Sequence, residues 1–340
     1  MNRHPTSGDP RPRTALLQHW VGMGDLVWHA PYFRAIAATS RDGKVSLIAP
    51  PSTFARELLG HEPWVQEIID FDRHPRRGEQ RKGRHRGILG LLRMGKELKP
   101  QGFERIVLFT NHTNRALVAW RAGIPQRLGY GTSWLQRRLL TKSPWIQRYT
   151  GPAVTAYKDA TAFAIAQGWC DAPITPRLVV RPDALARMRE ALAGMPRPLH
   201  AFAIGSSEPY KQWGADNFRA LADLVAAAGH GVLILAGPGE TAMAQSILRQ
   251  LAPAHRERVR AITNGTVGET VAAMSLVQSC VGNDTGAVQI AAAVNTPALV
   301  LLGPRPPLEH DPDTLQMLRA PALADIRPED VARRVIDAQR

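Results

Sequence analysis

The stretch from Val277 to Pro304 limits the possible folds more than any other part of the chain. It reads as four elements in series: a buried strand at 277–281, a polar turn at 283–286, an apolar helix at 287–294 and a second buried strand at 298–302. This order is the βαβ unit of a parallel sheet, in which ligands bind beyond the carboxyl ends of the strands. Asp284, Thr285 and Gly286 stand at such an end, where they can cap the helix or help it to bind an anion.

The same alternation of short apolar runs and helical segments occurs on both sides of a Pro-rich stretch at 173–182. Strands are expected at 14–20, 45–49, 65–71, 105–109 and 126–129 before it, and at 199–204, 231–236, 259–262, 277–281 and 298–302 after it. A chain of 340 residues fits two domains of about 150 residues, each large enough to bury a core. The sequence therefore predicts two α/β domains joined by the Pro-rich stretch.

Cysteine content and hydropathy narrow the class of protein. Cys170 and Cys280 lie 110 positions apart and belong to no CxxC or Cys/His cluster, so a disulfide framework or a zinc site is not expected. Because the sequence predicts no disulfide, we expect the protein in a reducing, cytoplasmic compartment. Residues 1–13 are polar and Pro-rich, which predicts a flexible tail rather than a signal peptide, and the apolar runs are too short or too interrupted to span a bilayer.

The net charge of +14 comes entirely from the first half of the chain. Residues 1–170 hold 26 Lys and Arg against 12 Asp and Glu, whereas residues 171–340 hold 17 of each. This asymmetry indicates that one half meets something anionic. Segment 73–86 holds seven of these cations and is either a solvated surface loop or an anion-binding loop. Residues 130–150 interleave tryptophans with basic residues, which suits a membrane surface, an acidic ligand or an ordinary surface helix.

Several polar residues follow the expected strands and so belong to the carboxyl edges of the sheets. Asp25 follows the first strand after a Gly-x-Gly turn, as either a helix cap or a catalytic carboxylate, and Asn111 follows the fourth strand. In the second half, Lys211 and Glu240 come after the strands at 199–204 and 231–236, and Thr266 precedes a helix. Three such strand ends on one edge make a site for a polar, phosphate-carrying ligand.

The order of these motifs resembles that of the heptosyltransferases of glycosyltransferase family 9. The motifs are Gly24-Asp25, Ser206-Ser207-x-x-x-Lys211-x-Trp213, Gly237-x-Gly239-Glu240 and Asn283-Asp284-Thr285-Gly286, followed by Pro297 and Gly303-Pro304. The resemblance covers roughly residues 14–335 and implies a GT-B architecture, two Rossmann-like domains with parallel sheets facing a central cleft. It implies an acceptor-binding domain at 14–172, a nucleotide-sugar donor-binding domain at 173–327, and a C-terminal helix at 328–340 that returns to the first domain.

The resemblance also implies an activity. This is inverting, metal-independent transfer of a sugar, typically heptose from ADP-heptose, to the anionic inner core of lipopolysaccharide, with no cofactor besides the substrate nucleotide sugar. Peripheral contact with the cytoplasmic face of the inner membrane would accompany it. Asp25 would be the general base. The implied donor contacts are Ser206, Ser207, Lys211, Glu240, Thr266, Asp284, Thr285, Gly286 and Gln289. By charge and edge position, the candidates for acceptor contacts are Arg76, Arg77, Arg81, Lys82 and Asn111.

One residue departs from the family pattern. Gln289 stands where the family commonly has histidine, and glutamine can donate a hydrogen bond to a phosphate but cannot carry a positive charge. Two alternatives therefore stay open, a transferase for a different nucleotide sugar and a catalytically silent protein that only binds nucleotide or glycan. The basic composition also raises nucleic-acid binding, but the chain holds no recognisable nucleic-acid module, so no nucleic-acid partner is expected.

Overall fold

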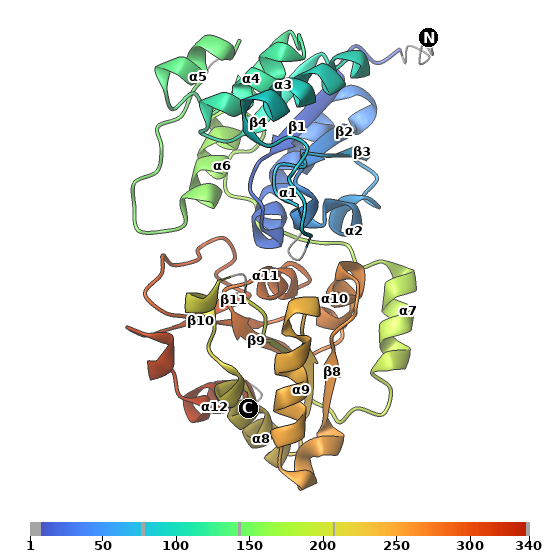
Figure 1. Cartoon of the computed structure of the whole chain (residues 1–340), viewed down its shortest axis with the longest axis vertical. Coiled ribbons are helices and arrows are strands. Elements are labelled where there is room, and N and C mark those ends of the chain that lie inside the picture. Colours follow the sequence, from blue (N-terminus) through green and yellow to red (C-terminus); the bar gives the residue numbers. More distant parts are fainter. Residues whose placement is uncertain (1–7, 76–78, 142–143, 207, 338–340) are drawn as a thin grey trace. The chain divides into compact units, whose positions relative to one another are not determined.

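The chain forms two compact units that divide between Thr175 and Pro176, three residues beyond the predicted boundary after residue 172. The structure is a computed structural model that describes residues 8–75, 79–141, 144–206 and 208–337. Each unit is built on one parallel sheet with helices on its faces (Figure 1). The predicted α/β class with two parallel sheets is confirmed.

The first unit has a five-stranded sheet in the order β3-β2-β1-β4-β5. Its strands are β1 (Thr14–Gln18), β2 (Val45–Ala49), β3 (Val65–Asp70), β4 (Arg105–Phe109) and β5 (Gln126–Gly129), and its helices are α1 (Met23–Ala38), α2 (Ala55–Leu59), α3 (Gly87–Leu98), α4 (Thr113–Arg121), α5 (Trp134–Leu139) and α6 (Thr155–Ala166). Every residue of β1, β2 and β4 is buried. Such continuous apolar runs are typical of a parallel sheet that helices cover on both faces.

The second unit has a six-stranded sheet in the order β11-β10-β9-β6-β7-β8. Its strands are β6 (Leu199–Ala203), β7 (Gly231–Leu235), β8 (Val259–Ile262), β9 (Ser279–Asn283), β10 (Ala298–Leu302) and β11 (Leu315–Arg319), and its helices are α7 (Pro182–Ala191), α8 (Ala215–Ala227), α9 (Thr241–Gln250), α10 (Val267–Met274), α11 (Gly286–Ala293) and α12 (Pro328–Asp337). At the centre of the sheet β9 lies close to β6, because a Cβ at Gly282 would stand 2.6 Å from the Cβ of Ala203. Only glycine fits there.

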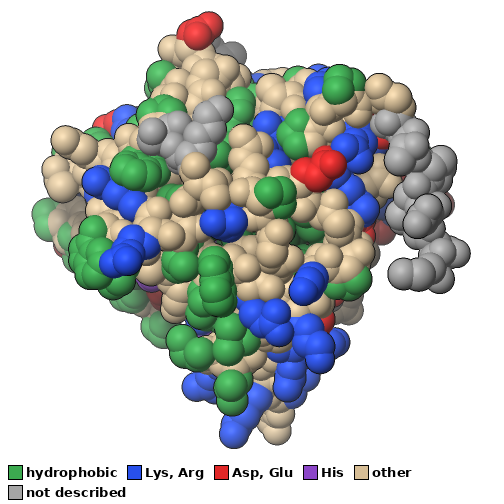
Figure 2. Space-filling view, turned by 90° about the horizontal axis from the view of Figure 1, so that it is seen from above, with side chains coloured by type: hydrophobic (Ala, Val, Ile, Leu, Met, Phe, Trp, Pro, Cys, Tyr) green, Lys and Arg blue, Asp and Glu red, His purple; other side chains and the backbone are tan. Residues whose placement is uncertain are grey.

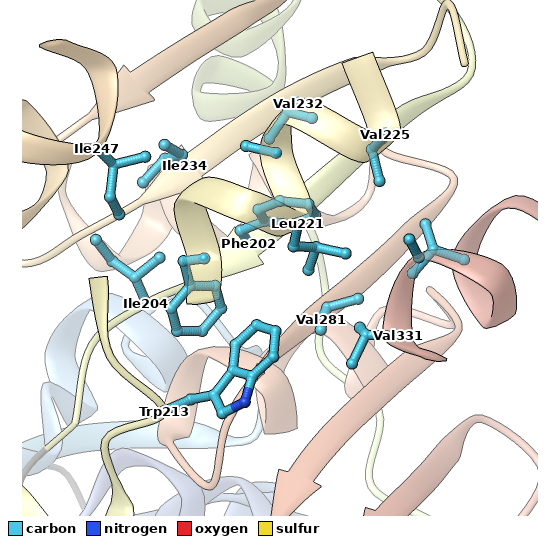
Figure 3. Close-up of a cluster of buried hydrophobic side chains, with 14 of the residues drawn as sticks. Phe202, Ile204, Trp213, Leu221, Val225, Val232, Ile234, Ile247, Val281 and Val331 are labelled. Atoms are coloured by element: carbon cyan, nitrogen blue, oxygen red, sulfur yellow. The ribbon is translucent and has the colours of Figure 1, made fainter. Parts of the chain in front are cut away.

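The last helix is the clearest difference from the prediction. Val331, Ala332 and Val335 of α12 are buried in the core of the second unit, where α12 packs on α8 (Figure 3). The prediction that this helix returns to the first domain is therefore wrong. The physical reason is that the apolar stripe of α12 finds the apolar stripe of α8 within its own unit, and burying it there removes both from water.

Most expected strands and helices are present with ends shifted by one to three residues. Helix α1 begins at Met23, so that Asp25 lies inside its first turn rather than before it. Three of the helices and strands listed above, α7, α9 and β11, were not expected from the sequence, and α5 lies in the segment for which an ordinary surface helix was one of the alternatives. No helix among the described residues is long and apolar enough to cross a membrane.

Candidate functional site

Both sheets reverse their strand order once, and most of the predicted site residues lie at these two places. In the first sheet the reversal falls between β1 and β4, which pair in parallel, and in the second between β6 and β9. Ligands of open α/β sheets bind outside the carboxyl ends of the strands at such a point. Asp25 and Asn111 follow β1 and β4, whereas Ser206 and Asp284 follow β6 and β9.

In the second unit, Asn283 fixes the geometry of this point. The side chain is fully buried at the end of β9 and accepts a hydrogen bond from the backbone N–H of Trp213 at 3.0 Å. Its amide group donates to the carbonyl oxygens of Ile204 and Gly205, at 2.9 and 3.1 Å, and to the side chain of Gln212 at 2.8 Å. Asn283 thereby joins the end of β6 and the turn that carries Lys211 to the end of β9.

Two cations share the carboxylate of Asp284. The Nε atom of Arg305 lies 3.1 Å from Asp284 Oδ2, and the Nζ atom of Lys211 lies 3.6 Å from the same oxygen. Lys211 also pairs with Glu208 at 3.3 Å, so the charges of this cluster balance. The side chains of Lys211 and Asp284 are only 14% and 12% exposed, which limits screening of the pair by solvent.

A pocket of about 290 Å³ opens beside this cluster within the second unit. Tyr210, Lys211, Asp284 and Arg305 supply its polar wall, and residues 301–304 and 321–323 supply the remainder. The guanidinium of Arg305 donates to the hydroxyl of Tyr210 at 2.8 Å. The sequence interpretation missed Arg305, although its position directly after Gly303-Pro304 at the end of β10 was a usable signal for the same sheet edge.

The amino end of α11 adds backbone N–H groups to this edge. Thr285 is its N-cap residue, and the Thr285 hydroxyl is buried without a hydrogen-bond partner among the described residues. Gln289, one turn into the helix, is 2% exposed. Helix amino termini carry partial positive charge, so that α11, Lys211 and Arg305 together favour an anion at this place.

Of the other predicted donor residues, Glu240 and Thr266 lie on the β7 and β8 side, Ser206 follows β6, and Ser207 lies outside the described residues. A Cβ at Gly237 would lie 2.9 Å from Oε2 of Glu240, which places this carboxylate against the end of β7. Thr266 caps α10 by accepting a hydrogen bond from the Glu269 N–H at 3.2 Å. The Ser206 hydroxyl forms a local turn with Glu208.

In the first unit, Asp25 holds the start of α1 and lies at the edge of the sheet. Its Oδ2 accepts a hydrogen bond from the Gly22 N–H at 3.2 Å, so the capping role foreseen for it is present. A Cβ at Gly22 would lie 2.7 Å from the same oxygen, and this is why glycine stands there. The Nδ1 atom of His29 lies 2.5 Å from the Asp25 carbonyl oxygen and anchors the turn from the core side.

Two histidines, His19 and His112, lie in the loops at the same sheet edge as Asp25 and have altered pKa values. His19 links the ends of β1 and β4 through a 3.1 Å hydrogen bond between its Nδ1 and the Phe109 carbonyl. Burial, and then the positive charge of neighbours that include His112 and Arg73, lower the pKa of His19 to about 3. Burial and the charges of Arg73 and Arg148 also lower the pKa of His112. Both rings are therefore neutral at pH 7 within a cationic surrounding.

The predicted acceptor contacts of segment 73–86 and the end of β4 lie in different settings. Arg81 is paired with Asp72 at 2.5 Å and with Glu79 at 2.8 Å, and Lys82 is exposed. Arg76 and Arg77 lie outside the described residues, and Asn111 is partly buried at the end of β4.

Two arginines that the sequence interpretation did not name as contacts, Arg73 and Arg115, bear more directly on anion binding. Arg115 is only 4% exposed, and neither Arg115 nor Arg73 has an ion-pair partner among the described residues. Their guanidinium groups lie 5.8 and 5.9 Å from the centre of the Phe71 ring. A buried guanidinium without a carboxylate is costly unless an anion arrives to pair with it. Nothing in the sequence indicated that Arg115 would be buried.

The fold and these sites define an α/β protein with a charged site at the switch point of its second sheet, where the chemistry of the side chains suits an anionic ligand. The sequence profile of glycosyltransferase family 9 (heptosyltransferase) matches residues 91–317, more than half of the chain. The chain belongs to this family and is a glycosyltransferase.

Relatives of known activity and a solved structure agree with this membership. Lipopolysaccharide heptosyltransferase 2 of Escherichia coli K12 is 24% identical over 318 residues, covering 88% of this chain and 86% of the relative. Lipooligosaccharide heptosyltransferase 2 of Haemophilus influenzae is 27% identical over 305 residues, covering 85% and 82%. The structure of E. coli ADP-heptose lps heptosyltransferase II superposes with a TM-score of 0.74 at 21% identity, covering 96% of this chain and 98% of that chain, which shows a common fold.

Proposed function

We propose that this glycosyltransferase moves a heptosyl group from ADP-heptose to an anionic acceptor of the lipopolysaccharide core. The names and coverage of its relatives support the reaction class. The observation that carries the proposal is the Asp284 cluster, with Lys211 and Arg305 beside the amino end of α11. This arrangement suits a diphosphate that enters by exchanging its charge for that of Asp284 and Glu208.

The strand order suggests how the donor would lie. With the diphosphate at the switch point between β6 and β9, the nucleoside would extend over β7 and β8, toward Glu240 and the Thr266 region. The sugar would then extend over β10, into the pocket beside Arg305. Glu240 would accept hydrogen bonds from the ribose hydroxyls.

The proposed reaction is a single inverting displacement without a metal ion. Asp25 removes the proton from the acceptor hydroxyl as that oxygen attacks the anomeric carbon, on the face opposite the diphosphate. The bond between the anomeric carbon and the diphosphate oxygen breaks, and the leaving diphosphate carries the electron pair. Lys211, the Thr285 hydroxyl and the Gly286 N–H stabilise its developing charge.

The acceptor is proposed to meet the first unit, at the cytoplasmic face of the inner membrane. Arg73, Arg115 and Lys82 have no carboxylate partner among the described residues, whereas Arg81 is already paired. Phosphate or carboxylate groups of a glycolipid core would supply the missing negative charge.

Gln289 supports one alternative, that the chain uses a different nucleotide sugar or only binds one. Its neutral amide can hydrogen-bond a phosphate without adding charge. A positive charge is nevertheless present near this place, because the guanidinium of Arg305, after the neighbouring strand β10, pairs with Asp284. We therefore propose that Arg305 supplies the charge that Gln289 does not.

Calorimetric titration with ADP, UDP and GDP tests the proposal. We expect selective binding of ADP, weakened in Lys211→Met and retained in Arg189→Met, which removes an exposed cation from α7 of the same unit. Preferred binding of UDP or GDP would keep the transferase and discard ADP-heptose. Absence of binding to all three nucleotides would contradict the donor site.

A further inference from the structure

Exposed apolar side chains gather on one part of the first unit. Of the eleven large apolar side chains that the described chain exposes, six lie on α3, α4, α5 or just after α5. They are Ile88 (58% exposed), Leu89 (80%), Trp120 (54%), Trp134 (63%), Leu135 (50%) and Trp145 (38%). We call them, with the basic residues described below, the α3–α5 face. Such clustering on a soluble domain marks a contact surface, whereas scattered exposed residues do not.

The three helices lie side by side, so that their exposed residues can contact one partner. Helix α3 packs on α4, and α4 packs on α5. The first contact is close, because a Cβ at Gly95 would lie 2.6 Å from the Cβ of Arg121. Figure 2 shows a face of the first unit on which hydrophobic side chains stand next to Lys and Arg, with few Asp or Glu.

Basic side chains are interleaved with the apolar ones. The guanidinium of Arg138 lies 5.8 Å from the Trp134 ring centre, and that of Arg137 lies 4.7 Å from the ring of Trp145. The Trp145 ring is seated on Gly131, whose φ is +63° and where a Cβ would overlap the indole. The tryptophans are therefore held at the surface by neighbouring groups rather than folded into the core.

The charge of this face has one sign. Its exposed or partly exposed basic residues are Arg93, Lys96, Arg121, Arg137 and Arg138. Glu97 is the one acidic residue in α3, α4 and α5, and Arg84 and His85 pair with it. Tryptophan, leucine and arginine together form the pattern of surfaces that lie in the headgroup region of a bilayer, with aromatic rings at the interface and cations on anionic lipids.

We infer that the α3–α5 face docks the protein on an anionic lipid bilayer. The inference deepens the proposed function, because a protein docked by this face could reach a lipid-linked acceptor. The residues of the face are not those assigned to the donor or the acceptor site. A second copy of the chain fits less well, because two such faces would oppose like charges. Nucleic acid would engage the arginines but would leave the aliphatic Ile88, Leu89 and Leu135 without an apolar partner.

Vesicle flotation of the full chain tests the inference. We expect binding to vesicles of phosphatidylglycerol and phosphatidylcholine, and much weaker binding to phosphatidylcholine alone. Arg137→Gln with Arg138→Gln should lower the partition coefficient by roughly tenfold or more, since each cation near an anionic surface contributes about a fivefold factor. Trp134→Ser with Leu135→Ser should lower it about tenfold. The matched control, Val179→Ser with Leu224→Ser, removes exposed apolar groups from the second unit and should leave binding unchanged.

Unchanged vesicle binding in both α5 variants would overturn the inference, as would absence of binding to anionic vesicles. So would a result in which the α5 variants alter only self-association, measured by sedimentation. Circular dichroism and thermal unfolding of each variant check that the fold is retained. If vesicle binding fails while transfer to a detergent-dispersed acceptor persists, the docking surface is wrong and the proposed function stands. If the chain binds anionic vesicles through this face but shows no transfer to the detergent-dispersed acceptor, the docking surface is right and the proposed function is wrong.

Discussion

The carboxyl edges of the two sheets both carry charged side chains, but they arrange them differently. In the second sheet each cation is matched, since Lys211 and Arg305 share Asp284 and Glu208 lies beside them. In the first sheet, Arg73 and Arg115 have no ion-pair partner among the described residues. The second edge is therefore electrically balanced before a ligand binds, whereas the first is cationic.

Under the proposed function, this difference corresponds to two modes of anion recognition in one chain. At the balanced edge a diphosphate would replace carboxylates that already hold the cations in position, so that little ordering of side chains would accompany binding. At the cationic edge an anionic acceptor would supply charge that the protein lacks. Burial, and to a smaller extent the charge of Arg73, lower the pKa of His19 at this edge, so that its ring is neutral there.

The largest expected effect comes from Asp25→Asn. The amide keeps an oxygen that can accept the Gly22 hydrogen bond, but it cannot take a proton, so we expect a loss in kcat of about 10³-fold with ADP affinity unchanged. Single-turnover transfer and ADP titration measure the two quantities. The control is Glu67→Gln, which neutralises a carboxylate within β3. Retention of transfer in Asp25→Asn would remove the general base from the first edge.

The next prediction concerns the pH dependence of stability, through a buried histidine at the amino end of β6. His200 is fully buried at the start of its strand, hydrogen-bonded to Ser279 and His230, and burial followed by the charge of His230 lowers its pKa to about 4. Because the unfolded pKa is near 6.5, stability from the neutral ring is present above that pH and is lost as the pH falls toward 4. At pH 5 the loss is about 2 kcal/mol of unfolding free energy.

Urea unfolding of the wild type and of His200→Gln at pH 7.5 and 5.0 checks this loss. The difference between the two pH values should shrink by about 2 kcal/mol in the variant. His61→Gln, at an exposed histidine, is the control and should leave the difference unchanged. An equal difference in wild type and His200→Gln would show that the acid sensitivity lies elsewhere.

Lys211→Met and Arg305→Met test separately which cation of the balanced edge binds the diphosphate and which binds the sugar. Loss of one charge-assisted hydrogen bond to the diphosphate should weaken ADP binding by roughly tenfold or more in Lys211→Met. Arg305 lies on the pocket side, so its loss should weaken binding of the nucleotide sugar more than that of ADP. Calorimetry with both ligands measures the ratio, with Arg189→Met on α7 as the control. Equal losses for ADP and nucleotide sugar in Arg305→Met would contradict the assignment of the pocket.

The smallest expected effect tests whether Arg115, at the cationic edge, binds the acceptor or only supports the fold. Arg115→Met removes a buried charge without a carboxylate partner, so we expect little loss of stability and roughly a tenfold rise in acceptor KM. Arg105 provides the contrast, because it is also buried but donates hydrogen bonds to Thr14, Thr39 and Ser40, which lie far from it in the chain. Arg115 donates one to its chain neighbour Asn114, at 2.8 Å. Arg105→Met should therefore destabilise the chain without changing acceptor KM. A destabilised Arg115→Met with normal KM would make Arg115 structural.

Much of this organisation could be predicted from the sequence because it depends on local patterns. Buried strands such as β2, β4 and β10 have the bounds that composition predicts, since continuous β-branched and leucine-rich runs have few alternatives in a parallel sheet. Asp284 and Lys211 could be assigned to one edge because parallel strands bring their carboxyl ends together. The capping role of Thr266 likewise follows from a motif of four residues.

Other features could not be obtained in this way because they depend on which surfaces meet. The packing of α12 on α8 was missed, since an apolar stripe specifies burial but not the partner that buries it. The neutralisation of Arg81 by Asp72 was missed because the pairing joins two parts of a loop whose path the sequence does not specify. Arg115 looked like any surface arginine at the start of a helix.

The sequence by itself determined the two parallel sheets, their division near the Pro-rich stretch, and the polar residues that follow each strand. These depend on periodicity and on turn chemistry, which act over a few neighbouring residues. Only the tertiary structure decided which charges are paired and which are not, how Asn283 holds Lys211 beside Asp284, and that the tryptophans of α4 and α5 lie on one face with the arginines. These depend on distances between segments far apart in the chain, where burial and Coulomb interactions are set by the packing of whole elements.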